Sequence, residues 1–132
     1  MSVANQPANI LLVEDSEDDA YFFRRALKKT GVPCECVHLW DGGAVANYLK
    51  NHPGQPHLLF LDLKIPVLNG FEVLNWIRDQ NLNQHLEIVI LSGSDDPKDI
   101  STARECGAND YLVKPVSVTE LAQKIQTWRG KQ

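Results

Sequence analysis

The chain has 132 residues, of which 43% are hydrophobic and 23% charged, and a formal net charge of −4. These values predict a globular domain with a buried core, exclude wholesale disorder, and argue against non-specific nucleic-acid binding, which needs clustered lysine and arginine. The apolar runs are too short to span a membrane, and residues 1–9 lack the basic-then-apolar order of a signal peptide, so we expect a cytoplasmic location.

Five short apolar runs alternate along the chain with five longer segments of helical character. The predicted strands are residues 10–13, 34–39, 58–61, 88–91 and 111–113. Most are continuous apolar runs, as expected for strands that helices cover on both faces. The second strand alternates between polar and apolar residues instead, which suits the edge of a sheet.

The segments between the strands have the spacing and end signals of helices. Apolar residues recur at helical spacing in four of them: Ala20, Phe23 and Leu27; Val45, Tyr48 and Leu49; Val73, Leu74 and Ile77; Leu121, Ile125 and Trp128. Asp96 before Pro97 is typical of the start of the fourth helix, and Ser117 with Glu120 predicts a capping box for the last. The fourth helix has one large aliphatic residue, Ile100, which fits either an ordinary surface helix or an element held weakly enough to shift.

Strict alternation of strands and helices predicts parallel strands joined by right-handed crossovers. We therefore expect an α/β fold of the flavodoxin-like, doubly wound (βα)5 type, with a five-stranded parallel sheet in the order 2-1-3-4-5. No segment predicts a DNA-binding domain or another output domain, so the effect of this chain is expected to pass through a partner protein.

Charged and polar residues follow the predicted strands at a common edge of the sheet. They are Glu14 and Asp15 after the first strand, Asp62 after the third, Ser92 after the fourth and Lys114 after the fifth. Because the carboxyl ends of parallel strands meet at one edge, we expect these side chains to converge. Three carboxylates against one lysine leave excess negative charge, so either a divalent cation such as Mg²⁺ binds or one acid stays protonated. On their own, Glu14 and Asp15 would also fit a solvated turn that leads into a helix.

This set of residues suits phosphoryl transfer to a carboxylate. Asp62 ends the strand expected at the centre of the sheet and is the best candidate nucleophile, with an acyl phosphate as the product. The metal ion and Lys114 would neutralise charge on the transferring group. The hydroxyl of Ser92 would hydrogen-bond a phosphoryl oxygen, although taken alone it is an ordinary serine at a strand end. Gly93 leaves the approach of a phosphoryl donor open.

Four segments resemble the receiver domains of bacterial two-component response regulators: ILLVEDS, LLFLDLKIPVLNG, VILSGS and GANDYLVKP, in the family's order and at its spacings. The resemblance implies that residues 1–132 form a single receiver domain, with a core of about residues 9–128 and short tails. Its implied function is that of a single-domain response regulator, which accepts a phosphoryl group from a histidine kinase or a phosphotransfer protein. Such a domain assists its own phosphorylation and dephosphorylation but is not an enzyme. The segments EDSEDDAYFFRRALKKTG and DGGAVANYL further resemble stand-alone receivers that partner photoreceptor or other sensory histidine kinases.

The resemblance also implies a role for each site residue. Asp62 is the phosphoacceptor, and Asp15 binds Mg²⁺ directly, with Mn²⁺ as an alternative ion. Glu14, where many members have aspartate, acts on the metal indirectly, and the backbone carbonyl of Lys64 is a further metal ligand. The side chain of Lys64 borders the entry to the phosphoryl group, which leaves the rate of dephosphorylation open. Lys114 and the hydroxyl that follows the fourth strand stabilise the phosphoryl group.

In this family a hydroxyl residue and an aromatic residue form a switch pair, which here implies Ser92 and Tyr111. Hydrogen bonding of Ser92 to the phosphoryl group would let Tyr111 turn inward and reshape the surface of the last two helices and the strand between them. From the residues alone, Tyr111 is an ordinary strand aromatic. The resemblance also implies a cis peptide bond between Lys114 and Pro115.

Three alternative functions share this architecture or this chemistry. A flavodoxin-like electron carrier needs a Ser/Thr/Gly-rich phosphate loop after the first strand, where this chain has the acidic segment EDSEDD. An aspartate-nucleophile phosphatase typically has a second aspartate two residues after the nucleophile, where this chain has Lys64. An intact set of site residues disfavours a scaffold that is never phosphorylated. The downstream protein is unknown, and phosphorylation forming a homodimer, releasing a bound partner or feeding a longer phosphorelay are alternatives that no residue pattern separates.

Overall fold

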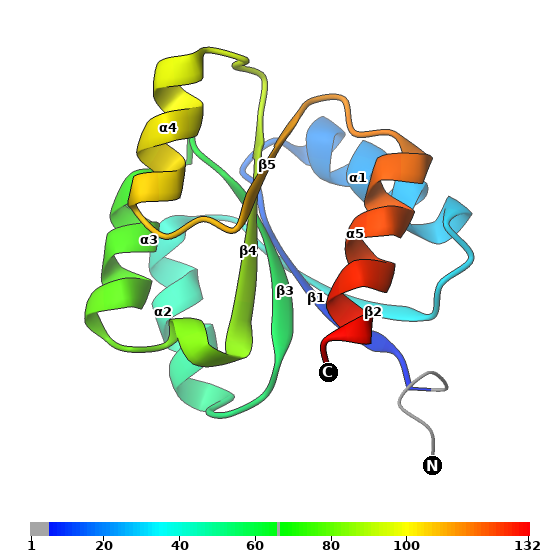
Figure 1. The fold of residues 1–132 in the computed structure, drawn as a ribbon, viewed down its shortest axis with the longest axis horizontal. Coiled ribbons are helices and arrows are strands. Elements are labelled where there is room, and N and C mark those ends of the chain that lie inside the picture. The colour runs from blue at the N-terminus through cyan, green and yellow to red at the C-terminus, as the bar shows by residue number, and fades with distance from the viewer. Residues whose placement is uncertain (1–5, 66) are drawn as a thin grey trace.

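The computed structural model describes residues 6–65 and 67–132, apart from the side chain of Asn83. Residues 1–5, which belong to the expected N-terminal tail, lie outside these ranges. Within the described ranges, strands and helices alternate from β1 to α5 (Figure 1). The strands are β1 (Ala8–Val13), β2 (Cys34–Leu39), β3 (His57–Asp62), β4 (Leu86–Ser92) and β5 (Asp110–Val113). The helices are α1 (Glu17–Lys29), α2 (Gly42–Asn51), α3 (Gly70–Asp79), the short 3-10 helix η2 (Asn83–His85), α4 (Pro97–Glu105) and α5 (Val118–Gly130).

The five strands form one parallel sheet in the order β2-β1-β3-β4-β5, which confirms the predicted fold and strand order. Figure 1 shows α2, α3 and α4 on one side of the sheet and α1 and α5 on the other. Every residue of β3 is buried, because this strand is central and helices cover both of its faces. β2 lies at the edge and is only half-buried or exposed, as its alternating sequence predicts.

Two hydrophobic layers hold the helices to the sheet, and successive residues of each strand enter opposite layers. Leu59 and Leu61 of β3 pack under α2 and α3, whereas Leu58 and Phe60 pack under α1 and α5. Among the described residues, no helix combines the length and the apolar content that a membrane crossing requires.

The helix ends agree with the predicted capping signals. Asp96 caps the start of α4 with Pro97 in the first turn, and Ser117 and Glu120 form the capping box of α5. Within α4, Ala103 is buried, whereas Ile100 is only half-buried, so little apolar surface holds this helix.

Candidate functional site

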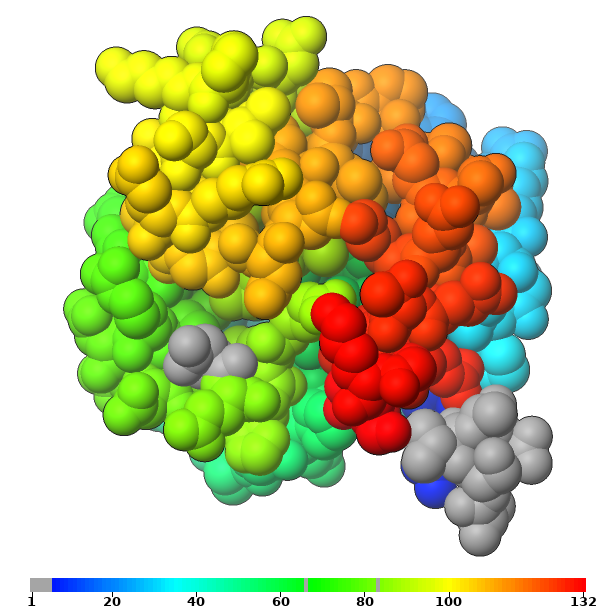
Figure 2. Space-filling model, viewed as in Figure 1, coloured from blue at the N-terminus to red at the C-terminus, as the bar shows by residue number. Residues whose placement is uncertain are grey.

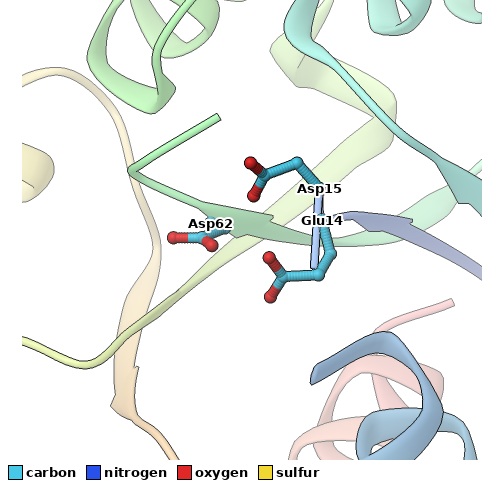
Figure 3. Close-up of side chains that lie close together, drawn as sticks. All are labelled: Glu14, Asp15 and Asp62. Atoms are coloured by element: carbon cyan, nitrogen blue, oxygen red, sulfur yellow. The ribbon is translucent and has the colours of Figure 1, made fainter. Parts of the chain in front are cut away.

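Three carboxylates converge at the carboxyl edge of the sheet. β1 and β3 are neighbours with Val13 opposite Leu61, so the next residues, Glu14 and Asp62, emerge side by side. Carboxylate oxygens of Glu14, Asp15 and Asp62 lie within 4.8 Å of one another. Figure 3 shows the three side chains close together. Glu14 and Asp62 are buried and Asp15 is exposed, so the cluster is open to solvent on one side.

Lys114 reaches this cluster from the end of β5. Its backbone N–H donates to the carbonyl of Ser92 at 2.8 Å, which extends the pairing of β4 with β5 by one residue. Its ammonium Nζ lies 2.5 Å from Glu14 Oε1 and 3.0 Å from Asp62 Oδ2. A third carboxylate, Asp19 in the first turn of α1, lies 2.9 Å from the same nitrogen.

The contact of Asp19 with Lys114 was not predicted from the sequence. An acid at this position is accounted for by the first turn of α1, where the helix dipole favours negative charge. Asp15 precedes the N-cap Ser16, so helical spacing does not relate these two acids, and no residue pattern predicts the contact. The site therefore contains one cation and four carboxylates, a larger imbalance than the sequence predicted.

Burial and hydrogen bonding shift the protonation equilibria of this cluster. Burial, together with a hydrogen bond to Asp62, raises the pKa of Glu14 to about 7, against the opposing effect of Lys114. Burial lowers the pKa of Lys114, but its bonds to Glu14, Asp19 and Asp62 outweigh this effect, and the pKa is raised above its ordinary value. Lys114 is therefore charged, and Glu14 takes up a proton at a higher pH than an ordinary glutamate does.

Both carboxylate oxygens of Asp62 are held by the protein. Oδ1 accepts a hydrogen bond of 3.0 Å from the backbone N–H of Lys64, and Oδ2 contacts Lys114. Gly70 is required beyond this loop because a Cβ atom there would lie 2.7 Å from the Cα of Leu63. Gly70 therefore packs closely against Leu63, next to the end of β3, and the backbone of Lys64 lies beside Asp62 while the Lys64 side chain is exposed.

The predicted switch residues meet at one loop residue, Ser94, for which the residue pattern predicts no role. Ser92 is buried at the end of β4, and its hydroxyl accepts a 3.2 Å hydrogen bond from the backbone N–H of Ser94. The half-buried Tyr111 donates its hydroxyl to the carbonyl of Ser94 at 2.9 Å. The hydroxyl of Ser94 in turn donates to Asp99 of α4 at 2.9 Å, which connects the end of β4 to that helix.

The peptide bond between Lys114 and Pro115 is cis, as the resemblance implies. The donor atoms of the acidic cluster are all carboxylate oxygens, the ligands that hard divalent cations such as Mg²⁺ and Mn²⁺ prefer. The residues present therefore fit the predicted type of metal ion.

Comparison with known proteins agrees with this geometry. Residues 10–126 match the family model of the response regulator receiver domain. The response regulator Rcp1 of Synechocystis sp. is 33% identical over 129 residues, which cover 93% of this chain and 87% of Rcp1. The crystal structure of the Mn²⁺-bound form of Rcp1 has a TM-score of 0.73 at 31% identity and covers 92% of this chain and 91% of that chain. The phosphorylated cyanobacterial phytochrome response regulator RcpA has a TM-score of 0.76 at 30% identity, with the same coverage of 92% and 91%. The chain therefore belongs to the response regulator receiver domain family of two-component systems.

Proposed function

We propose that this receiver domain accepts a phosphoryl group on Asp62 and passes the signal on by changing a protein-binding face. The observation that carries the proposal is the convergence of Asp62 with Glu14, Asp15 and Lys114 at one edge of the sheet. The donor is a phosphohistidine of a histidine kinase or of a phosphotransfer protein. The proposal includes a cytoplasmic location, where ATP is available to the kinase.

The transfer is a displacement at phosphorus. A carboxylate oxygen of Asp62 forms a bond to phosphorus as the bond from phosphorus to the donor imidazole nitrogen breaks, and the electron pair leaves with the imidazole. The N–H of Lys64 holds the Asp62 carboxylate in a fixed orientation, so little reorganisation precedes attack. Lys114 donates hydrogen bonds to the oxygens of the transferring group, on which negative charge is spread.

Mg²⁺ is the proposed cofactor, with Mn²⁺ as a substitute. Asp15, Asp62 and the backbone carbonyl of Lys64 would hold the ion, and Glu14 would act on it indirectly. A bound divalent cation supplies positive charge that offsets both the carboxylates and the phosphoryl group. The need for it follows from the imbalance in the site, where Lys114 already contacts three carboxylates. The Mn²⁺-bound form of the relative Rcp1 supports this assignment.

Ser92 and Tyr111 are the proposed switch residues. In the unphosphorylated protein the hydroxyl of Ser92 accepts a hydrogen bond from the backbone N–H of Ser94. When this hydroxyl bonds a phosphoryl oxygen instead, the hydrogen bonding of the loop around Ser94 changes. The hydroxyl of Tyr111 is hydrogen-bonded to the carbonyl of Ser94, so it responds to a change in this loop. Helix α4 can shift as well, because Ala103 is its buried residue and little other apolar surface attaches it to the sheet. The surface that responds is made by α4, β5 and α5, which lie next to one another in yellow to red on the face shown in Figure 2. A partner protein, or a second copy of this chain, would bind there.

The decisive experiment is intact-mass measurement after incubation with acetyl phosphate and Mg²⁺. We expect the wild type to gain one labile phosphoryl group and Asp62→Asn to gain none, because the amide is not a nucleophile toward phosphorus. Asp18→Asn, the same change at an exposed acid of α1, is the matched control and should behave as the wild type. Equal labelling of Asp62→Asn and the wild type would remove Asp62 from this role.

A further inference from the structure

The pairing of β1 with β2 ends next to the acidic cluster. Val13 lies opposite Leu39, and the backbone N–H of Glu14 donates to the carbonyl of Leu39 at 3.0 Å. β2 ends at Leu39, and Asp41 already caps the start of α2. The carbonyl of Glu14 therefore lies beyond the last residue of the strand that would otherwise pair with it.

The side chain of His38 bonds this carbonyl instead. Its Nε2 lies 2.8 Å from the backbone oxygen of Glu14. Because a carbonyl oxygen only accepts hydrogen bonds, Nε2 carries the proton and donates. The carbonyl belongs to the peptide that joins Glu14 to Asp15, so the bond fixes the orientation of the main chain between these two acids.

A second contact holds the imidazole of His38 in place. The ring packs against the indole of Trp40, with centroids 4.1 Å apart and planes inclined by 36°. His38 is half-buried and Trp40 is 46% exposed. The ring is thus restrained from two directions.

The geometry points to His38 as a positioning residue for the Mg²⁺ site, an inference that rests on the proposed function above. By donating to the carbonyl of Glu14, His38 keeps the peptide before Asp15 in the orientation in which the Asp15 carboxylate faces Asp62. Loss of a hydrogen bond that orients a metal ligand, from a residue that does not itself bind the metal, typically weakens metal affinity by about 10–100-fold. His38 therefore sets the Mg²⁺ affinity without belonging to the phosphoryl site.

Two substitutions separate the hydrogen bond from the ring. His38→Phe keeps an aromatic ring against Trp40 but removes the donor, whereas His38→Gln keeps an N–H at a similar reach but removes the ring. Isothermal titration calorimetry with Mg²⁺ measures the dissociation constant of each variant, and thermal melts in EDTA measure its stability. We expect His38→Phe to raise the dissociation constant for Mg²⁺ about tenfold and His38→Gln to leave it close to the wild-type value. This difference should hold whichever of the two variants has the higher melting temperature. At saturating Mg²⁺, His38→Phe should reach the wild-type rate of phosphorylation by acetyl phosphate.

A wild-type dissociation constant in His38→Phe would overturn the inference, and so would equal weakening in both variants, which would assign the effect to the ring. Both results leave the proposed function intact as long as the wild type binds Mg²⁺ and is phosphorylated on Asp62. A wild type that binds no Mg²⁺ would overturn the metal assignment and this inference together.

Discussion

Each end of the central strand β3 carries a buried polar residue, and the two residues differ in the partners that surround them. His57 begins the strand and is 2% exposed, whereas Asp62 ends it and is 7% exposed. His57 Nδ1 donates to the carbonyl of Gln55 at 3.0 Å, and its Nε2 accepts from the hydroxyl of Tyr48 at 3.2 Å. Asp62 instead shares the cation Lys114 with other carboxylates.

The difference between the two ends lies in their charge balance. A neutral imidazole with a partner on each nitrogen is buried at low cost, and burial keeps it neutral by lowering the pKa of His57, although the bond to Gln55 opposes this shift. At the other end, burial and the neighbouring Asp62 raise the pKa of Glu14 to about 7, and Lys114 only partly offsets this shift. An end with satisfied neutral groups stabilises the fold, whereas an end with unbalanced charge suits the binding of a cation and an anion. Stability and chemistry are thus divided between the two ends of β3.

The largest expected effect is on chemistry at the Asp62 end. Lys114→Met keeps the aliphatic stem but removes the charge that stabilises the transferring group, and it should slow phosphorylation by acetyl phosphate about 10²–10³-fold at saturating Mg²⁺. Intact-mass time courses give the rate. Lys28→Met is the matched control, because Lys28 is an exposed lysine in the last turn of α1. Similar losses in both variants would show that net charge, rather than the contact of Lys114, controls the rate.

The opposite end should respond in stability alone. His57→Leu leaves the Gln55 carbonyl and the Tyr48 hydroxyl without their partner, and we expect the free energy of unfolding in urea to fall by about 2–3 kcal/mol. His85→Leu, the same change at an exposed residue, should have little effect. The phosphorylation rate of folded His57→Leu should equal that of the wild type. A large drop in that rate would mean that the two ends are coupled and that the division fails.

The sequence predicts most of this architecture because hydrophobic periodicity and strand alternation determine which edge carries the polar residues. Asp62, Ser92 and Lys114 lie where strand ends predict them, since the carboxyl ends of parallel strands meet at one edge. The predicted limits of β1, β3, β4 and β5 were one to three residues too short because they followed apolar side chains. Main-chain pairing also includes polar residues, as Asp62 opposite Leu91 shows.

Contacts made by single rotamers and loop atoms were beyond prediction. The bond of Asp19 to Lys114, the two bonds of Ser94 and the bond of His38 to the Glu14 carbonyl all depend on loop paths that no residue pattern specifies. The β2 alternation indicated an edge strand but gave no reason to expect that one of its side chains would bond the main chain of Glu14.

The smallest expected effect is a pH dependence with opposite signs at the two ends. In the folded protein without metal, the pKa of Glu14 is raised from 4.5 to about 7, so between these values the folded state holds a proton that the unfolded state has lost. The stability from this group is full below pH 4.5 and is lost as the pH rises through 7. His57, with its pKa lowered from 6.5, contributes stability above pH 6.5 that is lost as the pH falls.

Urea unfolding in EDTA between pH 5 and pH 7 measures the balance of these two terms. We expect the free energy of unfolding of the wild type to fall by about 1–2 kcal/mol over this range, because the Glu14 term covers more of it than the His57 term. Glu14→Gln removes the first term, so its stability should stay level or rise with pH. Saturating Mg²⁺ should also remove the loss in the wild type, since ionised carboxylates then have a second cation beside Lys114. If the free energy of unfolding of Glu14→Gln fell by the same amount between pH 5 and pH 7, the pH dependence would come from another group and not from Glu14.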